Sequence, residues 1–175
     1  MKKFTFLLGM ALALLLTHSQ AFAQSDYKFH TVFIYNFTKY IQWPDANGSG
    51  NFVIGVVGES GITDALKGMA ANKKVNGRPI EVKVFKSAAE VANCHMVYLP
   101  DNQSGELGTL RSNLASKPTL IITERSGLAK KGSDINFVME GGRWKFEINQ
   151  AAADMHKLKI SQELTKFAVK IYNEV

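Results

Sequence analysis

Apolar side chains recur with a helical period in the stretch from Tyr27 to Pro44. At about 100° per residue, one face of such a helix carries Phe29, Phe33, Phe37 and Tyr40, flanked by Ile34 and Ile41. Asn36 lies at the border of this aromatic face, where we expect it to tie the helix to a neighbouring backbone. Because the residue before a proline disfavours the helical conformation, the helix should stop at Trp43-Pro44. The stretch therefore predicts a helix whose aromatic face packs into the core.

The middle of the chain alternates between strand-like and helix-like patterns. Short apolar or alternating runs typical of strands occupy residues 52–57, 80–84, 95–99 and 119–123. Between them, the segments 62–69, 88–93 and 104–115 show helical spacing. Strands that alternate with helices imply a parallel sheet covered on both faces. The pattern predicts a three-layer α/β/α, Rossmann-like fold with a mostly parallel sheet.

The C-terminal part has a different pattern. Residues 135–139 and 144–148 alternate in hydrophobicity around Gly141-Gly142, which is typical of a tight antiparallel hairpin at one edge of the sheet. Asn149 is placed to cap a helix over residues 150–155. Ser161 is placed to cap a last helix, one face of which would carry Leu164, Phe167, Ala168 and Ile171.

The first 23 residues have the composition of a secretory signal peptide. Lys2 and Lys3 precede a short apolar run, and Ala21-Phe22-Ala23 fits the cleavage site. Residues 24–175 would then form one exported domain, without a segment that spans a membrane. The style of the signal indicates a bacterial periplasm.

Charge and cysteine content exclude several classes of protein. The formal net charge of +6 includes the two signal lysines, and the remaining lysines are scattered, so nucleic acid is not an expected partner. Cys94 is the one cysteine, so no internal disulfide can form. Its position at the start of an apolar run indicates a buried, unreactive thiol, with an intermolecular bridge or an oxidation sensor as the alternatives.

The residues that could carry catalysis do not form a recognisable constellation. Gly55, Gly58 and Gly61 lack the spacing of a dinucleotide or phosphate loop, and Ser60 is not in a nucleophile elbow. The histidines have no metal-ligand spacing, and His30 falls on the apolar side of the first helix. Neighbouring strand residues point to opposite faces, so Cys94 and His95 should not meet. We expect no enzyme activity, no metal and no cofactor.

An open parallel sheet usually binds ligands where the carboxyl ends of its strands meet. Here that crevice would lie between residues 58–61, 100–102 and 124–125. The candidate ligand residues are Gly58, Glu59, Ser60, Gly61 and Arg125. A small-molecule sensor is therefore one predicted class of protein.

Glu147 stands out in an otherwise apolar and aromatic strand. Alternation predicts that it faces solvent. The alternative is a buried or interfacial carboxylate paired with Arg143 or with a partner's basic group. The chain also contains 11 Phe, 5 Tyr and 2 Trp, and such an aromatic load favours a binding or oligomer surface.

Several segments together resemble a known family. They are residues 36–44 (NFTKYIQWP), 55–58 (GVVG), 135–138 (INFV), 145–149 (KFEIN), 151–152 (AA) and 158–164 (LKISQEL). In this order they are similar to the YfiR/HmsC-like family of bacterial periplasmic regulators, over nearly all of the mature chain. From these segments we take Asn36, Trp43, Pro44, Glu147, Asn149 and Ser161 as candidate family-motif or interaction residues, and we add Arg143, which lies just before residues 145–149.

The resemblance implies a periplasmic protein that binds the periplasmic region of an inner-membrane diguanylate cyclase and represses it. Release would then raise cyclic di-GMP and promote exopolysaccharide and biofilm formation. It also implies a homodimer of Rossmann-like, disulfide-bearing subunits, from which this chain departs because Cys94 is alone. The alternative is a small-molecule-binding sensor module that acts on a membrane histidine kinase.

Overall fold

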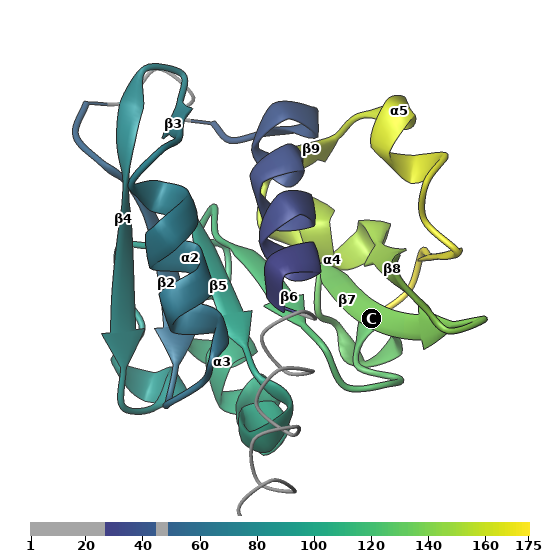
Figure 1. The fold of residues 1–175 in the computed structure, drawn as a ribbon. Coiled ribbons are helices and arrows are strands. Elements are labelled where there is room, and N and C mark those ends of the chain that lie inside the picture. Colours follow the sequence, from purple (N-terminus) through teal and green to yellow (C-terminus); the bar gives the residue numbers. More distant parts are fainter. Residues whose placement is uncertain (1–26, 45–48) are drawn as a thin grey trace, which may run out of the picture.

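One twisted sheet runs through the molecule, with the strand order β10-β8-β7-β6-β5-β2-β4-β3 (Figure 1). The structure is a computed structural model that describes residues 27–44 and 49–175, so the predicted signal peptide lies outside the described residues. The strands are β2 (Phe52–Val57), β3 (Lys74–Val75), β4 (Arg78–Phe85), β5 (Met96–Leu99), β6 (Leu120–Thr123), β7 (Ile135–Glu140), β8 (Arg143–Asn149) and β10 (Lys170–Tyr172). Strands β4, β2, β5, β6 and β7 are parallel, and β8 returns antiparallel to β7. The predicted α/β fold, mostly parallel with a C-terminal hairpin, is confirmed.

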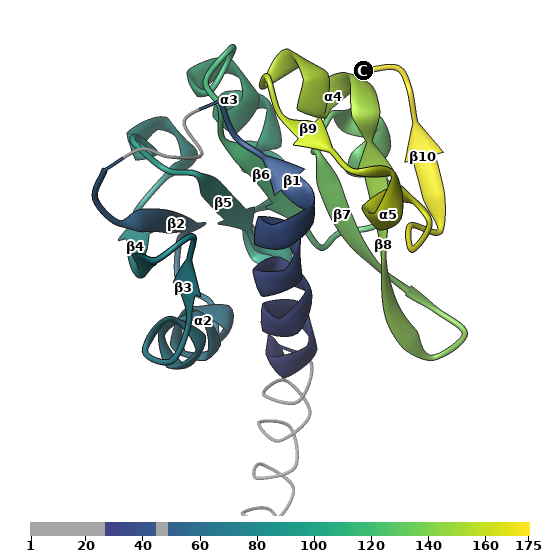
Figure 2. The ribbon, with the colours of Figure 1, turned by 90° about the horizontal axis from the view of Figure 1, so that it is seen from above.

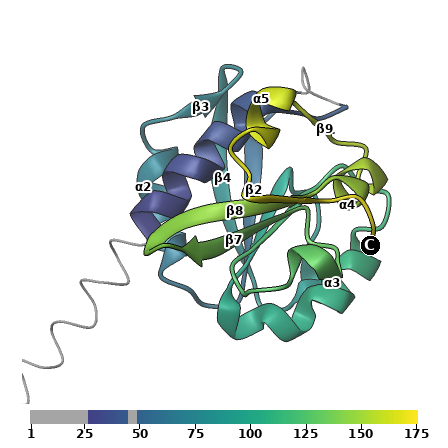
Figure 3. The same cartoon turned by 90° about the vertical axis from the view of Figure 1, so that its right-hand side faces the viewer.

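Helices cover both faces of the sheet (Figure 3). A first helix occupies residues 27–40. The others are α2 (Ile62–Ala70), η1 (Ala88–Glu90), η2 (Asp101–Glu106), α3 (Leu107–Asn113), η3 (Ala129–Lys131), α4 (Gln150–Met155) and α5 (Gln162–Thr165). The first helix and α2 lie on one face, and α3 lies on the other. No helix of the described residues is long and apolar enough to cross a bilayer.

Strand alternation divides the core into two parts. In β2, Phe52 and Ile54 point toward the first helix, while Val53 and Val57 point toward α3. Successive side chains of a strand face opposite sides, so a continuously apolar strand serves both cores. This explains why β2, β5 and β6 read as unbroken apolar runs.

The first helix is rotated relative to its predicted orientation. His30, Ile34, Phe37 and Ile41 are buried, whereas Phe29 is 58% exposed. Phe33 and Tyr40 are only partly buried against the core. The prediction that Phe29 belongs to the core is wrong, because a neighbouring face of the helix, with His30 and Phe37, packs against the aromatic rings of β7 and β8.

The first helix also ends earlier than predicted. Its last residue is Tyr40, and Ile41–Gln42 form strand β1, which pairs antiparallel with β9 (Lys159–Ile160). The amide of Ser161 donates to the carbonyl of Tyr40 at 2.9 Å. Pairing with a distant segment thus replaces the last helical turn before Trp43-Pro44.

The predicted last helix is largely wrong. Helix α5 has only four residues, and the chain then turns into β10, which runs parallel to β8 (Figure 2). Phe167 is therefore 67% exposed, and Ile171 lies in a strand. The helical spacing was misleading because β8 has an edge that another strand can join. The amide of Val169 donates to the carbonyl of Phe146 on this edge.

Candidate functional site

The three loops predicted to form a ligand crevice meet at the carboxyl ends of β2, β5 and β6. The side-chain amide of Asn102 donates to the carbonyl of Glu59 at 3.3 Å. The guanidinium of Arg125 pairs with the carboxylate of Asp101, which joins the loops after β5 and β6. The rule about strand ends therefore located the loops correctly. That Gly58, Glu59, Ser60, Gly61 and Arg125 bind a ligand stays a prediction.

A group of buried polar side chains lies next to these loops. The hydroxyl of Tyr98 donates to Glu124 Oε2 at 2.6 Å and lies 3.4 Å from His30 Nδ1. Burial, followed by the nearby Glu124 carboxylate, raises the pKa of Tyr98 well above its ordinary value. The other Glu124 oxygen accepts from the amide of Asp101 at 3.0 Å. His30 is a core histidine, as its spacing indicated, but no sequence pattern indicated its polar neighbours on β5 and after β6.

The start of the first helix contacts the loop after β2. A Cβ at Gly61 would lie 3.0 Å from the Tyr27 ring, so this position has no room for a side chain unless the ring moves. The hydroxyl of Ser60 donates to the Tyr27 hydroxyl at 3.4 Å and accepts from the amide of Ile62 at 3.4 Å. Ser60 and Gly61 thus allow the start of the first helix to pack closely against the loop after β2.

Trp43, from the family-like segment, is a packing residue. Its indole N–H donates to the carbonyl of His95 at 2.9 Å, and its ring meets Phe52 edge to face at 5.3 Å. Pro44 is exposed. Among the described residues, Asn36 has no hydrogen bond to a neighbouring backbone: its Oδ1 accepts from Lys39 Nζ at 3.3 Å, one turn further along the same helix. The expectation for Asn36 is therefore corrected, because the helix surface offers this nearer partner.

Glu147 is half-buried and has neutral partners. Its two carboxylate oxygens accept from the Asn136 amide at 3.2 Å and from the Tyr172 hydroxyl at 3.1 Å. The alternative of a pairing with Arg143 is not observed, since Arg143 is exposed near the hairpin turn and no ion pair between the two is found in residues 27–44 and 49–175. Strand β10, which runs beside β8, brings the Tyr172 hydroxyl to Glu147.

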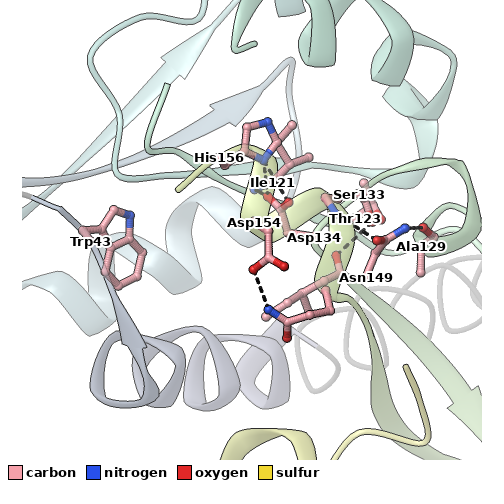
Figure 4. A network of polar contacts seen from close by, with 12 residues as sticks. Trp43, Ile121, Thr123, Ala129, Ser133, Asp134, Asn149, Asp154 and His156 are labelled. Atoms are coloured by element: carbon pink, nitrogen blue, oxygen red, sulfur yellow. Dashed lines mark hydrogen bonds and ion pairs between the residues drawn. The ribbon is translucent and has the colours of Figure 1, made fainter. Parts of the chain in front are cut away.

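Asn149 and Ser161 cap helices as predicted. Asn149 Oδ1 accepts from the amide of Ala152 at 2.9 Å, and Ser161 Oγ accepts from the amide of Leu164 at 3.3 Å. Asn149 is fully buried and also donates to the carbonyl of Ala129 at 2.8 Å (Figure 4) and to that of Glu174 at 2.9 Å. Asn149 thus has a wider structural role than a cap.

A buried pair of titratable side chains lies next to Asn149. The carboxylate of Asp134 is 2.9 Å from His156 Nδ1 and accepts the amide N–H of Ile121 (Figure 4). Burial raises the pKa of Asp134, and the hydrogen bond from His156 opposes that shift. This pair was not predicted from the sequence, because 22 residues separate its members and neither belongs to a motif.

The Cys94 thiol is buried, as predicted. Burial raises its pKa to about 11, which keeps it protonated and poorly nucleophilic at neutral pH. Cys94 packs in the core beneath α3, whereas the His95 ring stacks on Phe52 in the other core, at 4.5 Å between ring centroids. The two side chains therefore lie in different cores, as predicted, although both residues come just before β5 and not within it.

A groove of about 370 Å³ opens at the amino ends of the strands, opposite the predicted crevice. It is lined by Tyr35, Thr38, Lys39, Ile41, Gln42, Trp43, Phe52, Lys74, Val75, Asn76, Arg78 and His95. Arg78 is anchored at its rim by hydrogen bonds to the carbonyls of Gly50 and Asn51. With Lys39 and Lys74 it gives the groove three cations and no carboxylate among these lining residues. This groove was not predicted from the sequence, because its residues come from four separate segments.

Within the described part of the chain, no cluster of three or more histidine, cysteine, aspartate or glutamate side chains could hold a metal ion. The fold and its polar contacts define a Rossmann-like α/β domain in which most of the buried polar side chains have hydrogen-bond partners within the protein.

The chain belongs to the YfiR/HmsC-like family, whose sequence model matches residues 27–169. This is a family of periplasmic regulators, which places the protein in a regulatory class. No curated protein matches the chain.

Two solved structures share the fold at low sequence identity. One is a conserved domain protein from Vibrio cholerae O1 biovar El Tor, with a TM-score of 0.56 and 14% identity over 83% of this chain and 60% of that one. The other is an ABC domain in complex with L-Trp from Streptococcus pneumoniae, with a TM-score of 0.51 and 16% identity over 68% of this chain and 54% of that one. The chain thus spans less than two thirds of either structure, and these likenesses concern the fold alone.

Proposed function

We propose that the protein binds the periplasmic sensor region of an inner-membrane diguanylate cyclase and holds the cyclase inactive. The observation that carries this proposal is the family membership over residues 27–169. The signal-like composition of residues 1–23 supports export to the periplasm. Repression would lower cyclic di-GMP and with it exopolysaccharide and biofilm formation.

The docking surface for this partner is an apolar face on the first helix. Phe29 and Val32 are each 58% exposed, and they lie one helical turn apart. Val32 also lines a groove of about 490 Å³ between the first helix and α2, together with Lys28, Thr31, Tyr35, Ala65, Gly68, Met69 and Lys73. An exposed apolar groove flanked by lysines fits a partner segment with an apolar anchor and neighbouring carboxylates.

Placing a carboxylate on this surface should weaken docking. For Val32→Glu we expect the dissociation constant for the periplasmic domain of the cyclase to rise at least about tenfold, because a buried unpaired charge is costly and repels acidic residues. Met155→Glu is the matched control, since Met155 is also 58% exposed but lies on α4. Binding is measured by calorimetry with the purified domains.

The same variants test the proposal in cells. Deleting the gene should raise cyclic di-GMP and biofilm, and the wild type and Met155→Glu should restore repression while Val32→Glu should not. If deletion changes neither cyclic di-GMP nor biofilm, repression of a cyclase is wrong, and a membrane histidine kinase becomes the target to examine. If Val32→Glu binds like the wild type, the docking surface is wrong.

The groove at the amino ends of the strands, which we call the basic groove because Lys39, Lys74 and Arg78 line it, supports a second, compatible function. This function is the sensing of a small anionic molecule. Lys39, Lys74 and Arg78 supply positive charge, and Tyr35 and Trp43 supply aromatic surface. Such a combination suits a small carboxylate that carries an apolar or aromatic group. A ligand that favours one state of the protein would shift its affinity for the membrane partner.

Thermal unfolding with a panel of amino acids, aromatic acids and nucleotides tests this second function. We expect stabilisation by an anionic compound, and we expect Arg78→Ala to remove that stabilisation while Arg125→Ala does not. The reverse result would locate the ligand in the crevice at the carboxyl ends of the strands. No shift with any compound would leave only the protein contact.

A further inference from the structure

A cavity of about 340 Å³ is lined by parts of α3 and α4 and shares no lining residue with the basic groove. Its polar lining residues are Arg111 and Ser112 of α3, Ser116 in the following loop, and His156 directly after α4. All four side chains can donate a hydrogen bond, and no carboxylate is among the lining residues. The cavity therefore suits a ligand that is negatively charged and accepts hydrogen bonds.

His156 presents a ring nitrogen without a hydrogen bond to this cavity. The residue is only 5% exposed, and its Nδ1 lies 2.9 Å from the Asp134 carboxylate (Figure 4). The opposite ring nitrogen, Nε2, makes no hydrogen bond within residues 27–44 and 49–175. Because His156 lines the cavity and its Nδ1 faces the buried Asp134, Nε2 is the nitrogen on the cavity side.

The contact with Asp134 makes Nε2 a hydrogen-bond donor. Asp134 is fully buried, and burial raises the pKa of its carboxyl group, which favours the form of the Asp134–His156 pair that carries no net charge. In that form the proton between the two side chains lies either on the carboxylate or on Nδ1. In both cases Nε2 carries its own hydrogen, so it presents an N–H group to the cavity.

The guanidinium of Arg111 is held at the cavity by backbone contacts. Its Nη1 donates to the carbonyl of Lys131 at 3.1 Å. Gly132 follows with a φ of 94°, and a Cβ there would lie 2.6 Å from Arg111 Cζ, so glycine leaves room for the guanidinium against this backbone. A guanidinium has five N–H groups, and the carbonyl of Lys131 occupies one of them. Charged donors therefore remain for a ligand.

We propose that this cavity binds the phosphate group of a small phosphomonoester, with Arg111 and His156 Nε2 as the main donors. A phosphate group has three terminal oxygens that accept hydrogen bonds from different directions, whereas a carboxylate has two in one plane. Donors that come from α3, from the loop after it and from the end of α4 suit the phosphate. Gly108, Ala115 and Ala152 also line the cavity and leave room for a compact organic group beside the phosphate. The site does not depend on the identity of the membrane partner.

Calorimetric titration with glycerol phosphate and with inorganic phosphate, in a chloride buffer, tests the site. We expect both compounds to bind the wild type. Arg111→Gln should raise both dissociation constants by about tenfold or more, because it removes the charged donors. His156→Asn should also weaken binding, since asparagine can keep the hydrogen bond to Asp134 but has no atom at the place of Nε2. The matched control is Arg143→Gln, at an exposed position near the hairpin turn, which should bind like the wild type.

Circular dichroism and urea denaturation verify that each variant is folded. If His156→Asn does not fold, Arg111→Gln decides by itself, because Arg111 is only partly buried. A wild type that binds neither compound overturns the proposal, as does binding that Arg111→Gln leaves unchanged. Binding that is lost in Arg78→Ala but kept in Arg111→Gln would place the anion in the basic groove instead. Acetate that binds as tightly as inorganic phosphate would overturn the assignment to a phosphate group.

Discussion

Replacing Phe37 by alanine should lower the free energy of unfolding by about 3–5 kcal/mol. Phe37 is fully buried, and its ring lies 6.0 Å from that of Phe137 and 5.2 Å from that of Phe146, measured between centroids. The substitution leaves a cavity at the centre of the contact between the first helix and the hairpin of β7 and β8. Because the neighbouring rings belong to the sheet, they cannot collapse far into that cavity.

Phe29→Ala is the matched control on the same helix. Phe29 is mostly exposed, so its truncation should change the free energy of unfolding by no more than about 0.5 kcal/mol. Urea denaturation followed by far-ultraviolet circular dichroism measures both values, and unchanged m-values would show that the unfolded states are comparable. Equal losses for the two variants would contradict the observed orientation of the first helix.

The orientation of this helix shows where sequence periodicity stops being informative. The aromatic face predicted from Phe29 to Tyr40 and the observed buried stripe, which includes His30 and Ile34, are adjacent faces of one helix. Both contain apolar residues at spacings of three and four, so the period alone does not choose between them. Packing against the rings of Phe137 and Phe146 determines which face of the helix is buried. No local sequence pattern shows that strands β7 and β8 lie beneath the helix.

The parallel part of the sheet could be predicted because burial on both faces leaves a clear signature. Strands β2, β5 and β6 are short, continuously apolar and followed by polar turns. Strand β10 could not be predicted, since its three residues, Lys170 to Tyr172, are individually unremarkable. It forms because β8 presents an unpaired edge, which is a property of the folded hairpin.

The candidate functional sites also include some that could be located from the sequence and some that could not. The loops after β2, β5 and β6 meet as expected, because the carboxyl ends of parallel strands must lie at one edge of the sheet. The basic groove combines Lys39 of the first helix, Lys74 of β3 and Arg78 of β4, whose meeting depends on how the β3–β4 hairpin folds toward the helix. The buried contact between Asp134 and His156 likewise depends on the start of β7 and the end of α4 being brought together.

Asn149 lies in one of the segments that resemble the family, and its hydrogen bonds explain its role structurally. Its side chain makes three hydrogen bonds while fully buried, to the amide of Ala152 and to the carbonyls of Ala129 and Glu174. It therefore joins the start of α4 to η3 and to the C-terminal segment. A partner surface is not needed to explain this residue.

Asn149→Ala should lower the free energy of unfolding by about 3 kcal/mol or more, because it leaves several buried backbone groups without partners. Asn149→Asp should be at least as destabilising: a carboxylate can accept from Ala152, but it cannot donate to the two carbonyls. Ser161→Ala removes a single, less buried cap and should cost only about 1 kcal/mol. Urea denaturation of the three variants gives the comparison. If Asn149→Asp were as stable as the wild type, the cap alone would account for Asn149, and its two donated bonds would contribute nothing.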